Sequence, residues 1–181
     1  MNAIPAWRPG DERPDTEAMI RVDQAGEYGA TRIYAGQLAA LGARHPASRS
    51  IARMQSQERE HLKTFDAMMI ERGARPTLLQ PVWNVAGYWL GAATALMGPS
   101  AAMACTAAIE TEIDKHYSEQ LRALGGEEPD LARTIETFRQ EELEHRDTAI
   151  EAGAETAFGY PLLSGFIRAG CRLAIELSKR I

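Results

Sequence analysis

The sequence has no excess of positive charge and very little cysteine. Its 25 acidic residues outnumber its 20 basic residues and give a net charge of −5, so the charge balance offers no general attraction to nucleic acid. The two cysteines, Cys105 and Cys171, lie far apart and fit no metal-binding spacing. We interpret them as free thiols in a reducing compartment, although the sequence alone leaves a disulfide open.

Nucleotide-binding and targeting motifs are also missing. There is neither a glycine-rich phosphate loop nor a dinucleotide fingerprint, so a nicotinamide donor would bind without a Rossmann-type site. Residues 1–14 combine prolines with charges and lack the apolar core and cleavage site of a signal peptide. We therefore predict a disordered leader over residues 1–14, followed by one domain over residues 15–181. Residues 1–14 also lack the Arg- and Ser-rich, acid-poor composition of a transit peptide, which favours a bacterial cytoplasmic protein.

Charged residues are absent between Thr77 and Ile109, where Trp83, Tyr88 and Trp89 stand among alanines and glycines. Gly98-Pro99 interrupts this stretch, which makes a spanning helix the weakest interpretation. Two others remain. The stretch is either a crossover helix buried against the bundle or another subunit, or a face in contact with the membrane interface. We favour partial membrane contact.

Hydrophobic periodicity and helix-end residues predict an all-α protein. Four long helices form a bundle, joined by a crossover helix and followed by a C-terminal amphipathic helix with basic residues off its apolar stripe. The predicted ranges are 15–41, 46–73, 81–97, 100–124, 129–152 and 161–181. The glycines at 26, 29 and 36 indicate either a close approach to the backbone near Glu27 or a helix–helix crossing.

The pattern Glu-x-x-His occurs twice, as Glu58 with His61 and as Glu142 with His145. Residues three apart share one face of a helix, so each pair offers a carboxylate and an imidazole to the same metal. Proteins with two metal ions in a bundle core add one glutamate from each of the other two helices. Glu27 and Glu110 precede the two motifs at almost equal intervals and lie on apolar stripes, where an unpaired acid is costly to bury.

Several neighbouring residues have alternative interpretations. Glu112 is the rival of Glu110, but it lies off the apolar stripe. Tyr117 is most simply interpreted as a packed core residue, and the alternative hypothesis is a redox or proton-relay tyrosine. His116 is predicted to be a surface residue or to support the site from outside. Asp23 either orients a ligand imidazole or is solvated, and we expect the remaining motif glutamates to be solvated; these are Glu60, Glu141 and Glu144.

Four carboxylates and two imidazoles, with no thiolate, favour Fe(II) or Mn(II) over zinc. Four ionised glutamates also balance the charge of two divalent cations. A reduced pair of irons can activate O2 and insert one oxygen atom into a C–H bond. The composition of the predicted site therefore favours a pair of iron or manganese ions and is compatible with oxygen chemistry.

Several segments resemble the demethoxyubiquinone hydroxylase family. They are RVDQAGEYGA at 21–30, IYAGQ at 33–37, MACT at 103–106, EELEH at 141–145 and AGCR at 169–172. The resemblance covers nearly the whole chain after residue 14 and implies a ferritin-like fold. It also implies one iron held by Glu27, Glu58 and His61, a second held by Glu110, Glu142 and His145, and bridging by Glu58 and Glu142. Gln24 differs from the histidine of some relatives but lies outside these six ligands.

The resemblance further implies a monooxygenase that hydroxylates the ring of a demethoxyubiquinol with O2 in ubiquinone biosynthesis. A polyprenyl quinol stays in the bilayer, so we expect a peripheral protein on the cytoplasmic face of the cell membrane. The electron donor is left open between NADH and a reductase, as is assembly into a homo-oligomer or a ubiquinone-biosynthesis complex. The alternative is a ferritin-type ferroxidase or iron-storage protein. A rubrerythrin is weakened by the absence of a four-cysteine module, and a purely structural bundle leaves four buried acids unexplained.

Overall fold

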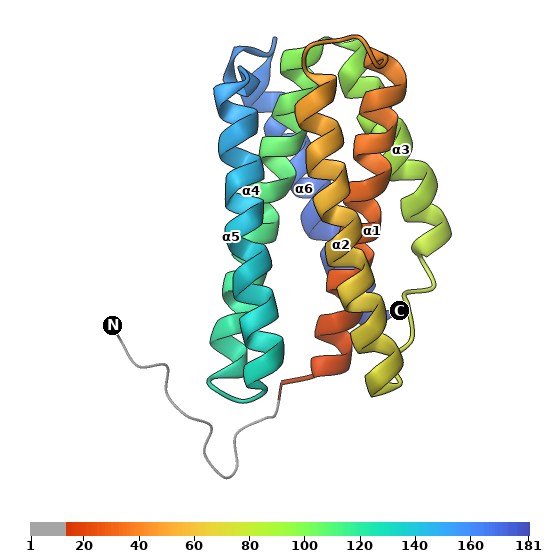
Figure 1. Cartoon of the computed structure of the whole chain (residues 1–181), viewed down its shortest axis with the longest axis vertical. Helices are drawn as coiled ribbons and strands as arrows, with labels where there is room; N and C mark the ends of the chain where they lie inside the picture. The colour runs from red at the N-terminus through yellow and green to blue at the C-terminus, as the bar shows by residue number, and fades with distance from the viewer. Residues whose placement is uncertain (1–13) are drawn as a thin grey trace.

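The computed structural model describes residues 14–181, which fold into a bundle of α-helices without a β-strand (Figure 1). The elements in chain order are α1 (Thr16–Leu41), α2 (Ser48–Arg72), α3 (Gln80–Leu96), α4 (Pro99–Leu124), α5 (Pro129–Glu151), the short 3-10 helix η1 (Ala154–Thr156) and α6 (Tyr160–Arg180). The predicted all-α fold is confirmed, with helix ends within two residues of those expected. Most of the predicted leader, residues 1–13, lies outside the described residues, and the single-domain division stays a prediction.

The four long helices α1, α2, α4 and α5 form the central bundle as two hairpins (Figure 1). Capping residues set their ends. The Asp15 carboxylate accepts a hydrogen bond from the backbone N–H of Ala18 at 2.9 Å and caps the start of α1. Gly73 and Gly125 adopt positive φ angles of 67° and 56° and end α2 and α4. Each hairpin contains one Glu-x-x-His motif, so the fold brings the two motifs together.

Helices α3 and α6 lie outside this bundle. Helix α3 packs along α1, and α6 packs across α4 and α1. The crossing of α1 and α3 is very close, because a Cβ on Gly36 would overlap the backbone carbonyl of Tyr88, and one on Gly91 would overlap that of Ile33. Gly36 is therefore explained by a helix crossing. Around Gly26 a Cβ would have open space, so no close approach to the backbone requires that glycine.

The apolar core consists of two clusters. Along the bundle axis, the two Glu-x-x-His motifs lie between them. One includes Ile20, Phe65 and Ile135, and the other includes Tyr34, Ile51 and Ala149. Both contain residues of all four central helices. The acids of the motifs therefore lie in the middle of the bundle with packed side chains above and below them.

Helices α3 and α6 leave large apolar side chains exposed. On α3 these include Val85, Trp89 and Leu96, which are 58%, 64% and 76% exposed. On α6 they include Leu162 and Phe166. Within residues 14–181, no helix combines the length and the apolar character that crossing a bilayer requires.

Candidate metal centre

Each central helix directs one glutamate into the middle of the bundle. These are Glu27 from α1, Glu58 from α2, Glu110 from α4 and Glu142 from α5, and none is more than 2% exposed. The helical spacing places His61 beside Glu58 and His145 beside Glu142, both buried. The fold thus gathers all six residues that the sequence predicts as metal ligands.

The six residues form two overlapping groups in which potential ligand atoms lie within 4.8 Å of one another. The first group is Glu27, Glu58, His61 and Glu142, and the second is Glu58, Glu110, Glu142 and His145. Glu58 and Glu142 belong to both. A carboxylate with two oxygens that belongs to both groups has the position that a bridging ligand requires.

The histidines turn the same ring nitrogen towards these carboxylates. His61 Nδ1 lies 3.1 Å from Glu142 and 3.5 Å from Glu27, and His145 Nδ1 lies 3.0 Å from Glu58. Five buried carboxylate oxygens of the four glutamates have no hydrogen-bond partner. Buried acids without donors are costly unless a cation neutralises them. The residues present therefore fit a pair of divalent metal ions.

The pKa values express the same crowding of negative charge. Burial, followed by the charges of neighbouring glutamates, raises the pKa of Glu58 and of Glu110 well above the ordinary value. Burial would lower the pKa of His61, but the nearby carboxylates of Glu142 and Glu27 favour the charged ring, outweigh this effect and raise that pKa to about 11. In the metal-free chain, protons must therefore supply the positive charge that metal ions would bring.

Two tyrosines hold the outer glutamates across the bundle. Tyr34 of α1 donates a hydrogen bond to Glu110 of α4 at 2.9 Å, and Tyr117 of α4 donates one to Glu27 of α1 at 2.5 Å. Tyr117 is thus more than core packing, because it contacts a predicted ligand. The sequence patterns did not single out Tyr34. The signal was there, because each tyrosine follows the glutamate of its own helix by the same seven positions.

Asp23 has a different role from either one expected. It is buried, so it is not solvated, and it contacts neither predicted ligand histidine. Its Oδ1 instead accepts hydrogen bonds from His116 Nε2 at 3.2 Å and from Gln120 Nε2 at 2.8 Å. His116, expected at the surface or in support of the site, is buried beside Tyr117. Asp23, His116 and Gln120 therefore form a buried polar cluster next to the glutamates.

The outer nitrogens of the two predicted ligand histidines contact other residues. His61 Nε2 lies 2.5 Å from Glu141, and His145 Nε2 lies 3.2 Å from the side-chain oxygen of Gln57. The expectation that Glu141 is merely solvated was wrong, because its side chain is only 37% exposed and contacts the ring of His61. Glu60 and Glu144 are exposed, as expected.

Glu112, the rival of Glu110, is buried but lies outside both groups of potential ligands. Its carboxylate accepts hydrogen bonds from Arg168 at 2.6 Å and Lys115 at 3.0 Å, and it pairs with Arg172 at 3.3 Å. This cluster fastens α6 to α4. Both cysteines are unpaired, which confirms that they are free thiols.

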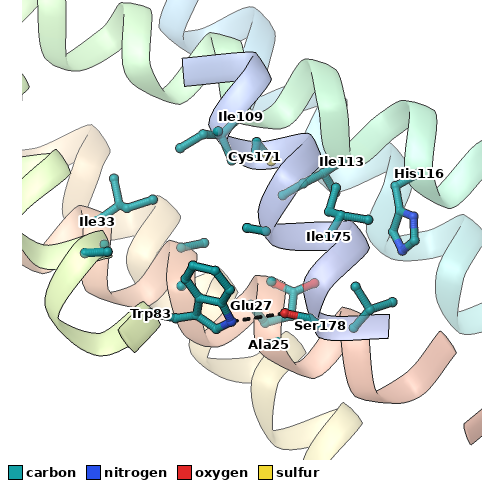
Figure 2. A pocket seen from close by; sticks show the side chains of 18 of the residues that line it. Ala25, Glu27, Ile33, Trp83, Ile109, Ile113, His116, Cys171, Ile175 and Ser178 are labelled. Atoms are coloured by element: carbon teal, nitrogen blue, oxygen red, sulfur yellow. Dashed lines mark hydrogen bonds between the residues drawn. The ribbon is translucent and has the colours of Figure 1, made fainter. Parts of the chain in front are cut away.

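A cavity of about 340 Å³ lies between the outer helices and the bundle and reaches Glu27. Helices α1, α3, α4 and α6 line it, mostly with apolar side chains (Figure 2). Trp83 of α3 donates a hydrogen bond from its indole N–H to Ser178 of α6 at 3.0 Å, which joins two walls of the cavity (Figure 2). Its polar lining includes Asp23, Glu27, His116 and Tyr117. A mainly apolar cavity therefore reaches a ligand of the candidate metal centre.

The fold and the site together define a helical-bundle protein with a carboxylate- and histidine-rich candidate site for two metal ions. The chain belongs to the ubiquinone biosynthesis protein COQ7 family, whose pattern matches residues 14–178. The resemblance inferred from sequence segments is thereby confirmed.

Curated relatives extend across both bacteria and eukaryotes. The chain is 54% identical over 175 residues to the 3-demethoxyubiquinol 3-hydroxylase of Rhodospirillum rubrum, covering 96% of this chain and 82% of that protein. It is 52% identical over 172 residues to the mitochondrial NADPH-dependent 3-demethoxyubiquinone 3-hydroxylase of Mus musculus, covering 93% and 79%. Its identity to the mitochondrial 5-demethoxyubiquinone hydroxylase of Saccharomyces cerevisiae is 41% over 181 residues, covering 91% and 78%.

Proposed function

We propose that this chain is a 3-demethoxyubiquinol 3-hydroxylase, which uses O2 to hydroxylate the ring of 2-polyprenyl-3-methyl-6-methoxy-1,4-benzoquinol in ubiquinone biosynthesis. The observation that carries the proposal is the mainly apolar cavity that ends at Glu27, a member of the paired glutamate and histidine groups. The names of relatives at 54% and 52% identity support the same reaction.

Two iron ions are the proposed cofactor. Glu27, Glu58 and His61 would hold one ion, Glu110, Glu142 and His145 the other, and Glu58 and Glu142 would contact both. When bound, such a pair supplies the activation of O2 that ring hydroxylation needs. Oxygen and imidazole ligands without thiolate support iron or manganese rather than zinc.

The cavity is the proposed binding site for the quinol ring. Its volume of about 340 Å³ lies at the small end of the range for ligand pockets, which suits a single substituted ring rather than a whole polyprenyl chain. Ile33, Leu90 and Ile113 line the cavity and exclude water from the ring. The hydroxyl groups of the ring would meet the polar groups of His116 and Tyr117 at the end near Glu27.

The hydroxyl oxygen of Tyr117 lies 2.5 Å from the Glu27 carboxylate oxygen to which it donates, and burial raises the pKa of that hydroxyl well above its ordinary value. Tyr117 therefore stays protonated at neutral pH and acts as a hydrogen-bond donor to Glu27. Asp23 in turn accepts from His116. These contacts fix the polar end of the cavity before a substrate enters.

Contact with a membrane is the second element of the proposal. A polyprenyl tail requires an apolar path out of the cavity, and α3 and α6, which wall the cavity, also carry exposed apolar side chains. We propose that these two helices rest in the membrane interface, so that the ring enters while the tail stays in lipid. A peripheral position on the cytoplasmic face of a bacterial membrane stays a prediction, as do the electron donor and any assembly.

The alternative is a ferritin-type ferroxidase, which would use the same ligands. The apolar cavity favours the hydroxylase, because iron oxidation and storage give no role to an apolar pocket next to the metals. A mass measurement separates the two functions.

The test is anaerobic loading of the protein with Fe(II), followed by a short-chain demethoxyquinol and O2, with the product measured by mass spectrometry. If the chain is the hydroxylase, the product carries one additional oxygen atom on its ring. Glu142→Ala should lose this activity, while the exposed control Glu144→Ala should retain it. Two bound irons that oxidise without forming a hydroxylated product would support the ferroxidase instead. Failure to bind iron at all would refute both.

A further inference from the structure

The residue directly before each motif glutamate contacts the histidine of the other motif. Glu141, which precedes Glu142 on α5, lies 2.5 Å from His61 Nε2 on α2. Gln57, which precedes Glu58 on α2, lies 3.2 Å from His145 Nε2 on α5. The two contacts occupy equivalent places in the two halves of the chain, but one partner is an acid and the other is a neutral amide.

Both contacts determine which ring nitrogen is free to bind metal. Glu141 and the side-chain oxygen of Gln57 can only accept a hydrogen bond, so each places the ring proton on Nε2. In the neutral ring, the form that binds metal, Nδ1 of each histidine keeps its lone pair and faces the central glutamates. Outer partners of this kind orient a histidine ligand and raise its basicity.

The two histidines are not held equally. A carboxylate makes a stronger, charge-assisted hydrogen bond than an amide oxygen does. Phe138, one turn before Glu141 on α5, also stacks on the ring of His61 with centroids 3.9 Å apart and an interplanar angle of 22°. The nearest aromatic neighbour of His145 is Tyr34, which meets it edge-on at 6.5 Å. His61 is thus fixed by an acid and a stacked ring, and His145 by an amide.

We infer that Glu141 and Gln57 are positioning residues for the two metal-binding histidines, and that their difference in charge makes the His61 position bind its metal ion more tightly than the His145 position. The inference rests on the proposed metal centre but not on the hydroxylation reaction. It concerns the order and strength of metal binding, which are measured without substrate or O2.

The test is anaerobic equilibrium titration with Fe(II), which yields two stepwise binding constants. Wild type should show two clearly different constants. Glu141→Gln keeps the shape and the hydrogen bond but removes the charge, and should weaken the tighter constant by about 10- to 100-fold. Gln57→Glu should strengthen the weaker constant by about tenfold. The double variant Glu141→Gln/Gln57→Glu should restore two separated constants, because the acid has moved to the other histidine.

The control is Glu144→Gln, which removes one exposed negative charge from the same helix without touching a histidine. Its constants should match wild type. Mössbauer spectra of the 57Fe(II)-loaded proteins give an independent readout. Wild type should show two resolved doublets, and in Glu141→Gln the parameters of these doublets should become more alike. A residue that only stabilised the fold would leave these spectra unchanged.

Unchanged constants and spectra in Glu141→Gln would overturn the inference while leaving the metal centre intact. Equal weakening in Glu141→Gln and Glu144→Gln would also overturn it, because overall charge would then explain the effect. Wild-type protein that binds no Fe(II) would remove the metal centre itself, and the inference with it. Loss of hydroxylation alone would bear only on the proposed function.

Discussion

The close crossing of α1 and α3 predicts opposite effects for two alanine substitutions on the same helix. Gly36 and Gly26 both lie inside α1, so replacing either with alanine brings the same gain in helix propensity, about 0.5–1 kcal/mol. They differ in what the added Cβ meets. At Gly26 it has open space, whereas at Gly36 it overlaps the backbone carbonyl of Tyr88.

A backbone carbonyl cannot rotate away as a flexible side chain can, so Gly36→Ala forces α3 away from α1. Overpacking of this kind costs about 1–3 kcal/mol. After the gain in helix propensity is subtracted, we expect Gly36→Ala to destabilise the protein by up to about 2 kcal/mol and Gly26→Ala to stabilise it by about 0.5–1 kcal/mol. For a chain of this size, each kcal/mol corresponds to about 2–4 °C in Tm.

Thermal unfolding followed by circular dichroism measures both variants against wild type under identical conditions. The two melting temperatures should fall on opposite sides of the wild-type value. Because α3 walls the cavity, Gly36→Ala should also weaken binding of a short-chain quinol analogue. Equal melting temperatures for the two variants would refute the close packing of α3 on α1, and with it the position of this cavity wall.

Three further predictions concern the surface, the salt-bridge cluster and the metal site. Trp89→Glu on the exposed face of α3 should reduce binding to anionic phospholipid vesicles in a flotation assay, whereas Arg53→Ala, on an exposed part of α2, should leave binding unchanged. Glu112→Gln should destabilise the protein by about 1–3 kcal/mol at neutral pH. Burial alone would raise the pKa of Glu112, but the hydrogen bonds that it accepts from Arg168 and Lys115 lower it. This stabilisation is therefore present above the ordinary carboxyl pKa and is lost as the pH falls below that value. Urea denaturation should show that the free energies of unfolding of the variant and wild type converge in acid. Fe(II) at about 100 times the Kd of the tighter position should raise the free energy of unfolding by about 2.7 kcal/mol through that position alone. In an anaerobic melting experiment, a chelator should abolish the increase and His61→Ala should reduce it.

Local sequence patterns predicted the fold and the six inward-facing residues well, because both depend on spacing along a helix. Helical periodicity places Glu58 beside His61 whatever the rest of the chain does. The stops at Gly73 and Gly125 follow from the positive φ angle that each adopts.

Contacts between helices were predicted poorly, because periodicity gives the face of a helix but not what packs against it. Glu141 and Asp23 illustrate the difference. Glu141 lies off the apolar stripe of α5 and yet reaches His61 on the neighbouring helix. Asp23 was considered as a partner for a ligand histidine, but α4 places His116 and Gln120 nearer to it.

The exposed apolar face of α3 shows the same limit. The uncharged stretch was expected to be either buried or in contact with a membrane. In the structure, α1 covers one side of α3, and the other side is exposed. Gly87 and Gly91 pack against α1, while Val85, Trp89 and Leu96 point away from the bundle. A uniform lack of charge cannot reveal which side of a helix is covered.

The contacts between the two halves of the chain have a consequence for folding. Tyr34 with Glu110, Tyr117 with Glu27, His61 with Glu141 and His145 with Gln57 join residues that are 76, 90, 80 and 88 positions apart. Each half thus supplies the hydrogen-bond partners for the acid and the histidine of the other. Neither hairpin can assemble the site alone, and contacts of such long sequence separation form only after the hairpins dock. Tight metal binding would therefore mark the completion of folding, and a newly made chain would remain without its metals until its C-terminal hairpin had joined the first.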